Sequence, residues 1–207
     1  DVYKRQHPDD IEQAWEAIKV AKDSRIHVFT STSEIHMEHM LRKTKEDILK
    51  DTRESVKYAK KLCQDVEFSA QDATRTDKDF LIEVLKIAVE EGATTINVPD
   101  TVGYATPKDY LDLLQSVYED VKGGNEDVII STHCHNDLGL AVANSLTAIT
   151  AGARQIEGAI NGIGERAGNT STEEIIMAIK TRQDQFGVDI KAETTEIFET
   201  SRLVSKL

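Results

Sequence analysis

The sequence has 207 residues, of which 39% are hydrophobic and 30% are charged, a composition typical of a folded globular protein rather than a disordered one. Its formal net charge of −12 argues against a nucleic-acid partner, because a phosphate backbone requires a basic face. No apolar run approaches the roughly 18 residues that span a bilayer, and Cys63 and Cys134 are too few for a disulfide framework. We therefore expect a cytoplasmic protein without a membrane partner.

Helical and strand-like patterns alternate along the chain. The predicted helices are 9–22, 39–63, 77–92, 106–121, 138–152 and 171–185, and the predicted strands are 25–33, 65–73, 93–103, 127–135 and 153–162. The basic cluster LRKTK, at 41–45, is expected to form a solvated helix face. This alternation predicts repeated βα units and a parallel sheet, but by itself it does not separate a barrel from an open doubly wound sheet.

The two ends of the chain differ from its middle. Residues 1–6 (DVYKRQ) fit no pattern that continues into the first helix, and we interpret them as a non-native lead-in. Residues 7–190 hold the alternating elements and are predicted to form one domain. Residues 191–207 stop inside a helical pattern, IFETSRLVSKL, and are predicted to begin a linker helix to a further C-terminal region. We therefore expect a fragment of a longer protein.

Polar side chains gather where four successive strands end. Because i and i+2 share one face of a strand, and parallel sheets carry sites at the carboxyl ends of their strands, these side chains are predicted to line one site. The clusters are Ser69 and Gln71, then Asn97 and Thr101, then His133, His135 and Asp137, and finally Glu157, Asn161, Glu165, Arg166 and Asn169.

His133 and His135, in the stretch ISTHCHNDLGLAVANS, are the candidate metal ligands. Two imidazoles at i and i+2 can direct nitrogens at one point, with carboxylate or amide oxygens from other strand ends completing the site. A lone histidine is more often structural, and His-x-His alone is a weak signal. The position at a strand end beside Asp137 favours a divalent metal. Cys134 lies on the opposite face and is interpreted as a small buried residue.

The glycine-rich stretch NGIGERAGNTSTEE, at 161–174, is the second candidate for a binding segment. Its glycines permit a positive φ and a close backbone approach. Two interpretations stay open. The stretch is either a turn in which Arg166 pairs with Glu165 or another neighbour, or a site for a phosphate-bearing substrate at the helix start near Ser171.

Five stretches together resemble the 2-isopropylmalate synthase family: HVFTSTSEIHMEHML, VEFSAQDATRTD, INVPDTVGYATP, ISTHCHNDLGLAVANS and EGAINGIGERAGNTSTEE. This family belongs to a superfamily of metal-dependent TIM barrels that also contains homocitrate synthases, citramalate synthases and hydroxymethylglutaryl-CoA lyases. The resemblance covers nearly the whole chain from about His7 onward. It implies that the five predicted strands are strands four to eight of a (β/α)8 barrel, so the fold class is α/β and the fold a partial TIM barrel.

The activity that the resemblance implies is a metal-dependent Claisen condensation. Acetyl-CoA and 2-oxoisovalerate would give 2-isopropylmalate and CoA, an acyltransferase reaction and the first committed step of leucine biosynthesis. A divalent cation (Mn, Zn or Mg) would polarise the ketone as a Lewis acid. The partners would be the 2-oxo acid and acetyl-CoA, and the full-length protein is expected to be a homodimer.

Positions that match the family's motifs imply a set of site residues. The expected metal ligands are His133, His135 and Asn169. The expected catalytic residues are Gln71, Ser69 and His36. The expected substrate-binding residues are Asn97 and Thr101, for the 2-oxo acid, and Gly162, Gly164, Glu165 and Arg166, for acetyl-CoA.

Three features depart from the family's pattern. The opening strand with its Asp-Arg-Glu motif, which should supply a carboxylate ligand and a catalytic arginine, is absent from the chain. Position 71 is Gln where many relatives carry Glu, and Gln cannot ionise. The helical subdomain and the leucine-binding regulatory domain are absent too. We therefore expect the chain to be inactive alone, because an open five-stranded piece exposes a sheet edge.

Three alternative functions stay open. The same condensation on another 2-oxo acid would give citramalate or homocitrate. A lyase or aldolase of the superfamily would cleave a carbon–carbon bond with the same metal. A degenerate barrel would be a non-enzyme that binds a metal or a partner, an idea that Gln71 and the missing strand support.

Overall fold

The computed structural model describes residues 8–207 and contains one parallel sheet of five strands. The strands are β1 (Arg25–Ser31), β2 (Asp65–Gln71), β3 (Thr95–Asp100), β4 (Ile129–Cys134) and β5 (Gln155–Glu157). All five lie within the predicted segments, although β5 is much shorter than the predicted 153–162. The lead-in predicted for residues 1–6 lies outside the described residues.

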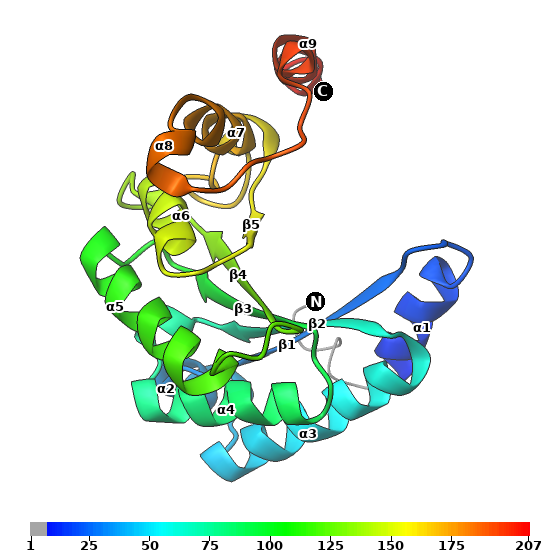
Figure 1. Ribbon diagram of the computed structural model, residues 1–207. Coiled ribbons are helices and arrows are strands. Elements are labelled where there is room, and N and C mark those ends of the chain that lie inside the picture. The colour runs from blue at the N-terminus through cyan, green and yellow to red at the C-terminus, as the bar shows by residue number, and fades with distance from the viewer. Residues whose placement is uncertain (1–7) are drawn as a thin grey trace.

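The strand order β1-β2-β3-β4-β5 follows the chain without a reversal. A doubly wound sheet reverses its order at a switch point, whereas a barrel adds each βα unit on the same side. Figure 1 shows the larger helices along one face of the curved sheet. The fold is therefore a partial TIM barrel, as predicted. These helices are α3 (Lys45–Leu62), α4 (Lys78–Glu90), α5 (Pro107–Val117), α6 (Ala141–Thr150) and α7 (Thr172–Thr181), with α1 (Pro8–Ile18) preceding β1.

Strong curvature brings side chains of the two edge strands into contact. Arg25 on β1 donates from Nη1 to Oε1 of Gln155 on β5 at 2.5 Å, although three strands separate them in the sheet. Glu67 on β2 accepts from Gln155 Nε2 at 3.1 Å. Contacts of this kind require the sheet to curl upon itself, as the strands of a barrel do.

Alternation divides the strand residues between two environments. Even-numbered positions face the helices and form the apolar core, where Val66, Phe68, Ile96 and Val98 are fully buried. Bulky branched residues usually fill the interior of a TIM barrel as well. Here the odd-numbered positions on the concave face are mostly polar, so we expect the functional site on this face. They include Arg25, His27, Glu67, Ser69, Asn97, Ser131, His133, Gln155 and Glu157.

The predicted helix 39–63 was wrong as a single element. A short helix, α2 (Glu34–His36), runs into a π-helical turn, η1 (Met37–Leu41), which ends at Arg42 with a φ of 54°. A new helix, α3, then begins after Thr44, whose side chain accepts from the backbone of Asp47 while the Asp47 carboxylate accepts from the backbone of Thr44. This capping box starts a helix at Lys45, so the cluster at 41–45 is a turn rather than a helix face.

The C-terminal elements pack at the end of the sheet near β5. The predicted helix 171–185 is divided into α7 and α8 (Gln183–Phe186), and α9 (Ile197–Val204) follows. Asn161 donates from Nδ2 to the carbonyl of Ser201 at 3.0 Å, so α9 contacts the turn after β5. Within residues 8–207, no helix combines the length and the hydrophobicity of a membrane span. The remaining short helices are η2 (Ala73–Arg75), η3 (Tyr118–Lys122), η4 (Ile160–Gly162) and η5 (Thr194–Glu196).

We predict that Thr44→Ala lowers the free energy of unfolding by about 1 kcal/mol, because α3 loses its N-terminal cap. Thr44→Ser keeps the hydroxyl and should stay within about 0.5 kcal/mol of the parent protein. Urea unfolding followed by circular dichroism measures both. Equal stability of the two variants would show that the capping box contributes nothing.

Candidate functional site

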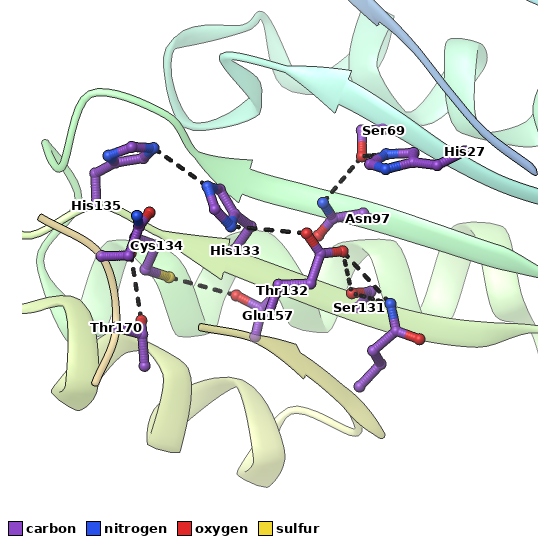
Figure 2. Close-up of polar contacts among 12 residues, drawn as sticks. His27, Ser69, Asn97, Ser131, Thr132, His133, Cys134, His135, Glu157 and Thr170 are labelled. Carbon is purple, nitrogen blue, oxygen red and sulfur yellow. Dashed lines mark hydrogen bonds and ion pairs between the residues drawn. The ribbon is translucent and has the colours of Figure 1, made fainter. Parts of the chain in front are cut away.

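The candidate site lies at the carboxyl ends of the strands, on the concave face. The parallel register pairs Ser69 with Asn97 and His133 with Glu157, so polar side chains of neighbouring strands stand at the same level. These are positions at which the sequence predicted a polar cluster. Figure 2 shows two sets of joined side chains on this face, one formed by His27, Ser69 and Asn97 and the other by His135, His133, Glu157 and Ser131.

The two predicted metal ligands point toward each other. His133 Nε2 and His135 Nε2 are 3.2 Å apart, and their ring centroids are separated by 5.0 Å. Burial, together with the neighbouring His135 and His27 rings, lowers the pKa of His133 to about 4. Burial and then the Arg166 guanidinium lower the pKa of His135. Both imidazoles are therefore neutral at pH 7, the state in which a nitrogen lone pair binds a metal.

Asn169, the third predicted ligand, lies beside His135. The two residues form an isolated antiparallel bridge, and the next backbone N–H, that of Thr170, donates to the Cys134 carbonyl at 3.0 Å. Asn169 Oδ1 is buried and has no hydrogen-bond partner. Two neutral imidazoles and an unpartnered amide oxygen are a donor set that suits a divalent cation. Within residues 8–207, no group of three or more His, Cys, Asp or Glu side chains is arranged to hold one.

Cys134 lies between the two histidines in sequence but on the helix-covered face of the sheet. Its side chain is fully buried, and its thiol is unpaired with any other cysteine in the described chain. The interpretation of Cys134 as a small core residue is therefore confirmed by its burial.

A second polar group lies farther along the concave face. Asn97 donates from Nδ2 to Ser69 Oγ at 2.9 Å, and His27 Nε2 lies 2.6 Å from the same oxygen. Asn97 Oδ1 is buried without a partner, so one acceptor remains available in this group. The sequence prediction included Ser69 and Asn97 but missed His27. Alternation from Arg25 along β1 could have placed His27 on the inner face.

The other two predicted catalytic residues lie toward β1. Gln71 accepts from Ser31 Oγ through its Oε1 at 2.5 Å. His36, on α2, has its Nδ1 at 3.6 Å from Asp72 Oδ2. The structure thus places His36 next to the carboxylate that follows β2 and does not bring it together with His133 and His135.

The glycines after β5 leave space that Asn169 of the same chain occupies. A Cβ on Gly164 would lie 1.9 Å from Asn169 Nδ2, and one on Gly162 would lie 3.0 Å from the Asn169 carbonyl oxygen. Glu165, between them and Asn169, has an exposed side chain. The start of α7 near Ser171 is flanked by acidic side chains, and Glu173 accepts from the backbone of Asn161 at 2.8 Å. An anion at this helix start would meet that carboxylate.

Thr101 and Arg166, both predicted to bind substrate, are joined to each other. Arg166 donates from Nη2 to the Thr101 carbonyl at 2.8 Å and from Nε to Asp137 Oδ1 at 2.8 Å. The Thr101 hydroxyl accepts from the backbone N–H of Asp72 at 2.9 Å. Pairing of Arg166 with a neighbour, one of the two interpretations of the glycine-rich stretch, is thus present, and the neighbour is Asp137.

A buried carboxylate pair, which the sequence prediction did not identify as such, lies below the histidines. Glu157 Oε2 is 3.6 Å from His133 Nδ1, and its Oε1 accepts from Ser131 Oγ at 3.2 Å. Burial and the nearby Glu67 carboxylate raise the pKa of Glu157 to about 8. Burial also opposes ionisation of Glu67, but hydrogen bonds from Glu157 and Gln155 outweigh it and lower the pKa of Glu67. At pH 7 the pair therefore holds one proton between its two carboxyl groups.

Comparisons with known proteins find relatives along nearly the whole chain. The sequence profile of the HMGL-like family matches residues 2–204. The chain is 54% identical over 198 residues to a 2-isopropylmalate synthase of Pelotomaculum thermopropionicum and 53% identical over 200 residues to one of Dictyoglomus turgidum. These matches cover 96% and 97% of the chain but only 39% of each relative.

A solved structure shows the same fold. The chain is similar to an HMG-CoA lyase from Acinetobacter baumannii in complex with coenzyme A and 3-methylmalate, with a TM-score of 0.79 at 20% identity. The match covers 97% of this chain and 66% of that one. At this identity the likeness concerns the fold, and it confirms the barrel class.

We predict that Glu157→Gln stabilises the protein increasingly as pH rises from 5 to 8. An unfolded Glu ionises near pH 4.3, whereas folded Glu157 holds its proton to about pH 8. In that window the folded state binds more protons than the unfolded state, so the free energy of unfolding of the parent protein falls as pH rises. A neutral Gln at position 157 removes this loss of stability. The Tm difference should grow by several °C, since about 1 kcal/mol shifts Tm by roughly 2–4 °C at this size.

Glu126→Gln is the matched control, because this glutamate is 84% exposed. Its Tm difference from the parent protein should be the same at every pH. A flat profile for Glu157→Gln as well would contradict the shared proton.

Proposed function

Because the chain belongs to the HMGL-like family, we propose that it forms the metal-binding half of a 2-isopropylmalate synthase barrel. The whole protein would condense acetyl-CoA with 2-oxoisovalerate to give 2-isopropylmalate and CoA. The observation that carries the proposal is the convergence of His133 Nε2 and His135 Nε2 at the carboxyl end of a barrel strand. The chain spans 39% of the length of the curated relatives it matches, so the remaining catalytic groups are assigned to other parts of the whole enzyme.

In this proposal His133, His135 and Asn169 hold a divalent cation, Mn, Zn or Mg. The cation supplies Lewis-acid polarisation of the ketone when it is bound. Burial keeps both imidazoles unprotonated, so the ligands are ready without the loss of a proton. The resemblance assigns the carboxylate ligand to the Asp-Arg-Glu motif of the opening strand.

The polar group around Ser69 would bind and orient the 2-oxo acid. Ser69 Oγ already lies within hydrogen-bond distance of His27 and Asn97, which fixes its direction. Thr101 stands at the end of the neighbouring strand. Gln71 is uncharged, so its part would be to orient a group by hydrogen bonding and not to remove the methyl proton of acetyl-CoA. His36 is proposed to line the same pocket as Ser69.

Acetyl-CoA would approach from the loop after β5. Gly162, Gly164 and Glu165 line this approach in the proposal, and the side chain of Glu165 is exposed there beside Arg166. The whole protein would act in leucine biosynthesis, in the cytoplasm and as a homodimer.

Metal binding by the 207-residue chain tests the ligand assignment directly. We expect Co²⁺ or Mn²⁺ to bind the parent chain in isothermal titration, and His133→Ala and His135→Ala each to weaken binding by at least about tenfold. His39→Ala is the matched control, because this histidine is 69% exposed on η1, and it should bind as the parent does. Equal affinity for all four proteins would remove the metal assignment.

The reaction is tested in a chimera in which this chain replaces the matching 198 residues of the Pelotomaculum protein. We expect CoA release with 2-oxoisovalerate, little release with pyruvate or 2-oxoglutarate, and none after His133→Ala. The 207-residue chain alone should release no CoA. Preference for pyruvate or 2-oxoglutarate would instead indicate citramalate or homocitrate synthesis, and cleavage of 2-isopropylmalate or a 3-hydroxyacyl-CoA without condensation would indicate a lyase.

A further inference from the structure

A chain of hydrogen bonds joins the loops that follow four strands. Arg166 binds the Asp137 carboxylate through Nε and Nη2, at 2.8 and 3.0 Å, and the Thr101 carbonyl through Nη2 at 2.8 Å. We name these three residues the Arg166 latch. The Thr101 hydroxyl extends the latch to the loop after β2 by accepting from the backbone of Asp72.

Backbone geometry is adapted to the latch. Arg166 has a φ of 55°, a left-handed conformation that is uncommon for a long side chain such as arginine and is favoured only where surrounding contacts fix it. Gly103, in the loop after β3, has a φ of 59°, and a Cβ there would lie 2.6 Å from the backbone nitrogen of Asp137. The loops after β3 and β4 are therefore in backbone contact where the guanidinium joins them.

The latch residues are close in sequence to the proposed metal ligands. Asp137 comes two positions after His135, and Arg166 comes three positions before Asn169. The His135 backbone N–H donates to the Asp100 carbonyl at 3.1 Å, next to Thr101. The Asn136 N–H donates to the Gly168 carbonyl at 2.9 Å, next to Asn169. A displacement of the Arg166 guanidinium would therefore also displace the segments that carry His135 and Asn169.

We propose that Arg166 is a positioning residue, which holds His135 and Asn169 in register by fixing the loops after β3, β4 and β5 to one another. The proposal rests on the proposed function for the identity of the ligands, but the latch is a property of this chain. It assigns to Arg166 a role different from direct contact with an anionic substrate.

The charges around Arg166 favour positioning over anion binding. Nε and Nη2 are occupied by Asp137 and Thr101, and the remaining nitrogen, Nη1, lies 3.7 Å from Glu165 Oε2. An anion reaching the guanidinium would meet two carboxylates first. A bidentate arginine–carboxylate pair is also the geometry that adds directional order to an interaction, which a point charge such as Lys cannot reproduce.

Hydrogen exchange on the 207-residue chain tests the latch without reference to activity. We expect Arg166→Lys, Asp137→Asn and the double variant to lose amide protection to the same extent at Asn136, Asn169 and Thr170. Removing either partner opens the same latch, so the second change adds little. Arg182→Lys is the matched control, because Arg182 forms the same two-bond contact with Asp184 on an exposed surface. Unchanged protection in all variants would overturn the proposal.

Kinetics of the chimera described above separate positioning from substrate binding. Positioning predicts that Arg166→Lys and Asp137→Asn each lower kcat by roughly tenfold to a hundredfold, with the double variant no worse and the KM for acetyl-CoA within about twofold. If Arg166 instead bound substrate, Arg166→Lys would raise the KM for acetyl-CoA and Asp137→Asn would not. The effects of the two changes would then multiply in the double variant. An inactive parent chimera would refute the proposed function while leaving the exchange result to decide the latch.

Discussion

The in-register pairing of parallel strands is the constraint on which the site depends. Each strand pair aligns odd positions with odd positions, as in His27 with Glu67 and Asn97 with Ser131. Because side chains alternate, every odd position then points to the concave face. A slip of one residue in β4 would move His133 and His135 under the helices and bring Cys134 to the site. The buried even positions oppose such a slip, since it would expose the apolar Ile130 and separate the Thr132 hydroxyl from the Tyr110 hydroxyl.

The polar concave face requires compensation, and the contacts between edge strands provide it. Burying a charge is costly unless it is paired and hydrogen-bonded. Glu67 is almost completely buried, and it receives a hydrogen bond from Arg25 and two from Gln155. The same contacts join β1 and β2 to β5 across the concave face, so the residues that neutralise Glu67 also maintain the curvature of the sheet. The proton that Glu67 and Glu157 share removes the second charge that this face would otherwise bury.

The sequence predicted those features that rest on local periodicity. Alternation of strand and helix patterns gave five βα units, and the polar strand ends gave His133, His135 and Asn169 as neighbours. The break before α3 was missed because the helical pattern continues through Arg42, and only the capping geometry of Thr44 and Asp47 ends it. The Glu67–Glu157 pair was missed because 90 residues of chain and two strands separate its members, and the curvature that joins them is not visible in local patterns.

The charge balance around His135 connects the latch to the proposed cation. Burial and then the guanidinium of Arg166 lower the pKa of His135, which favours the unprotonated imidazole that binds a metal. An uncompensated guanidinium would also repel the cation. Asp137 accepts two hydrogen bonds from Arg166, and Arg166 is the leading cause of its lowered pKa, so the carboxylate stays ionised beside the arginine. The pair therefore adds little net charge near the site while it fixes the loops, so one ion pair can order the ligand-bearing segments without driving the cation away.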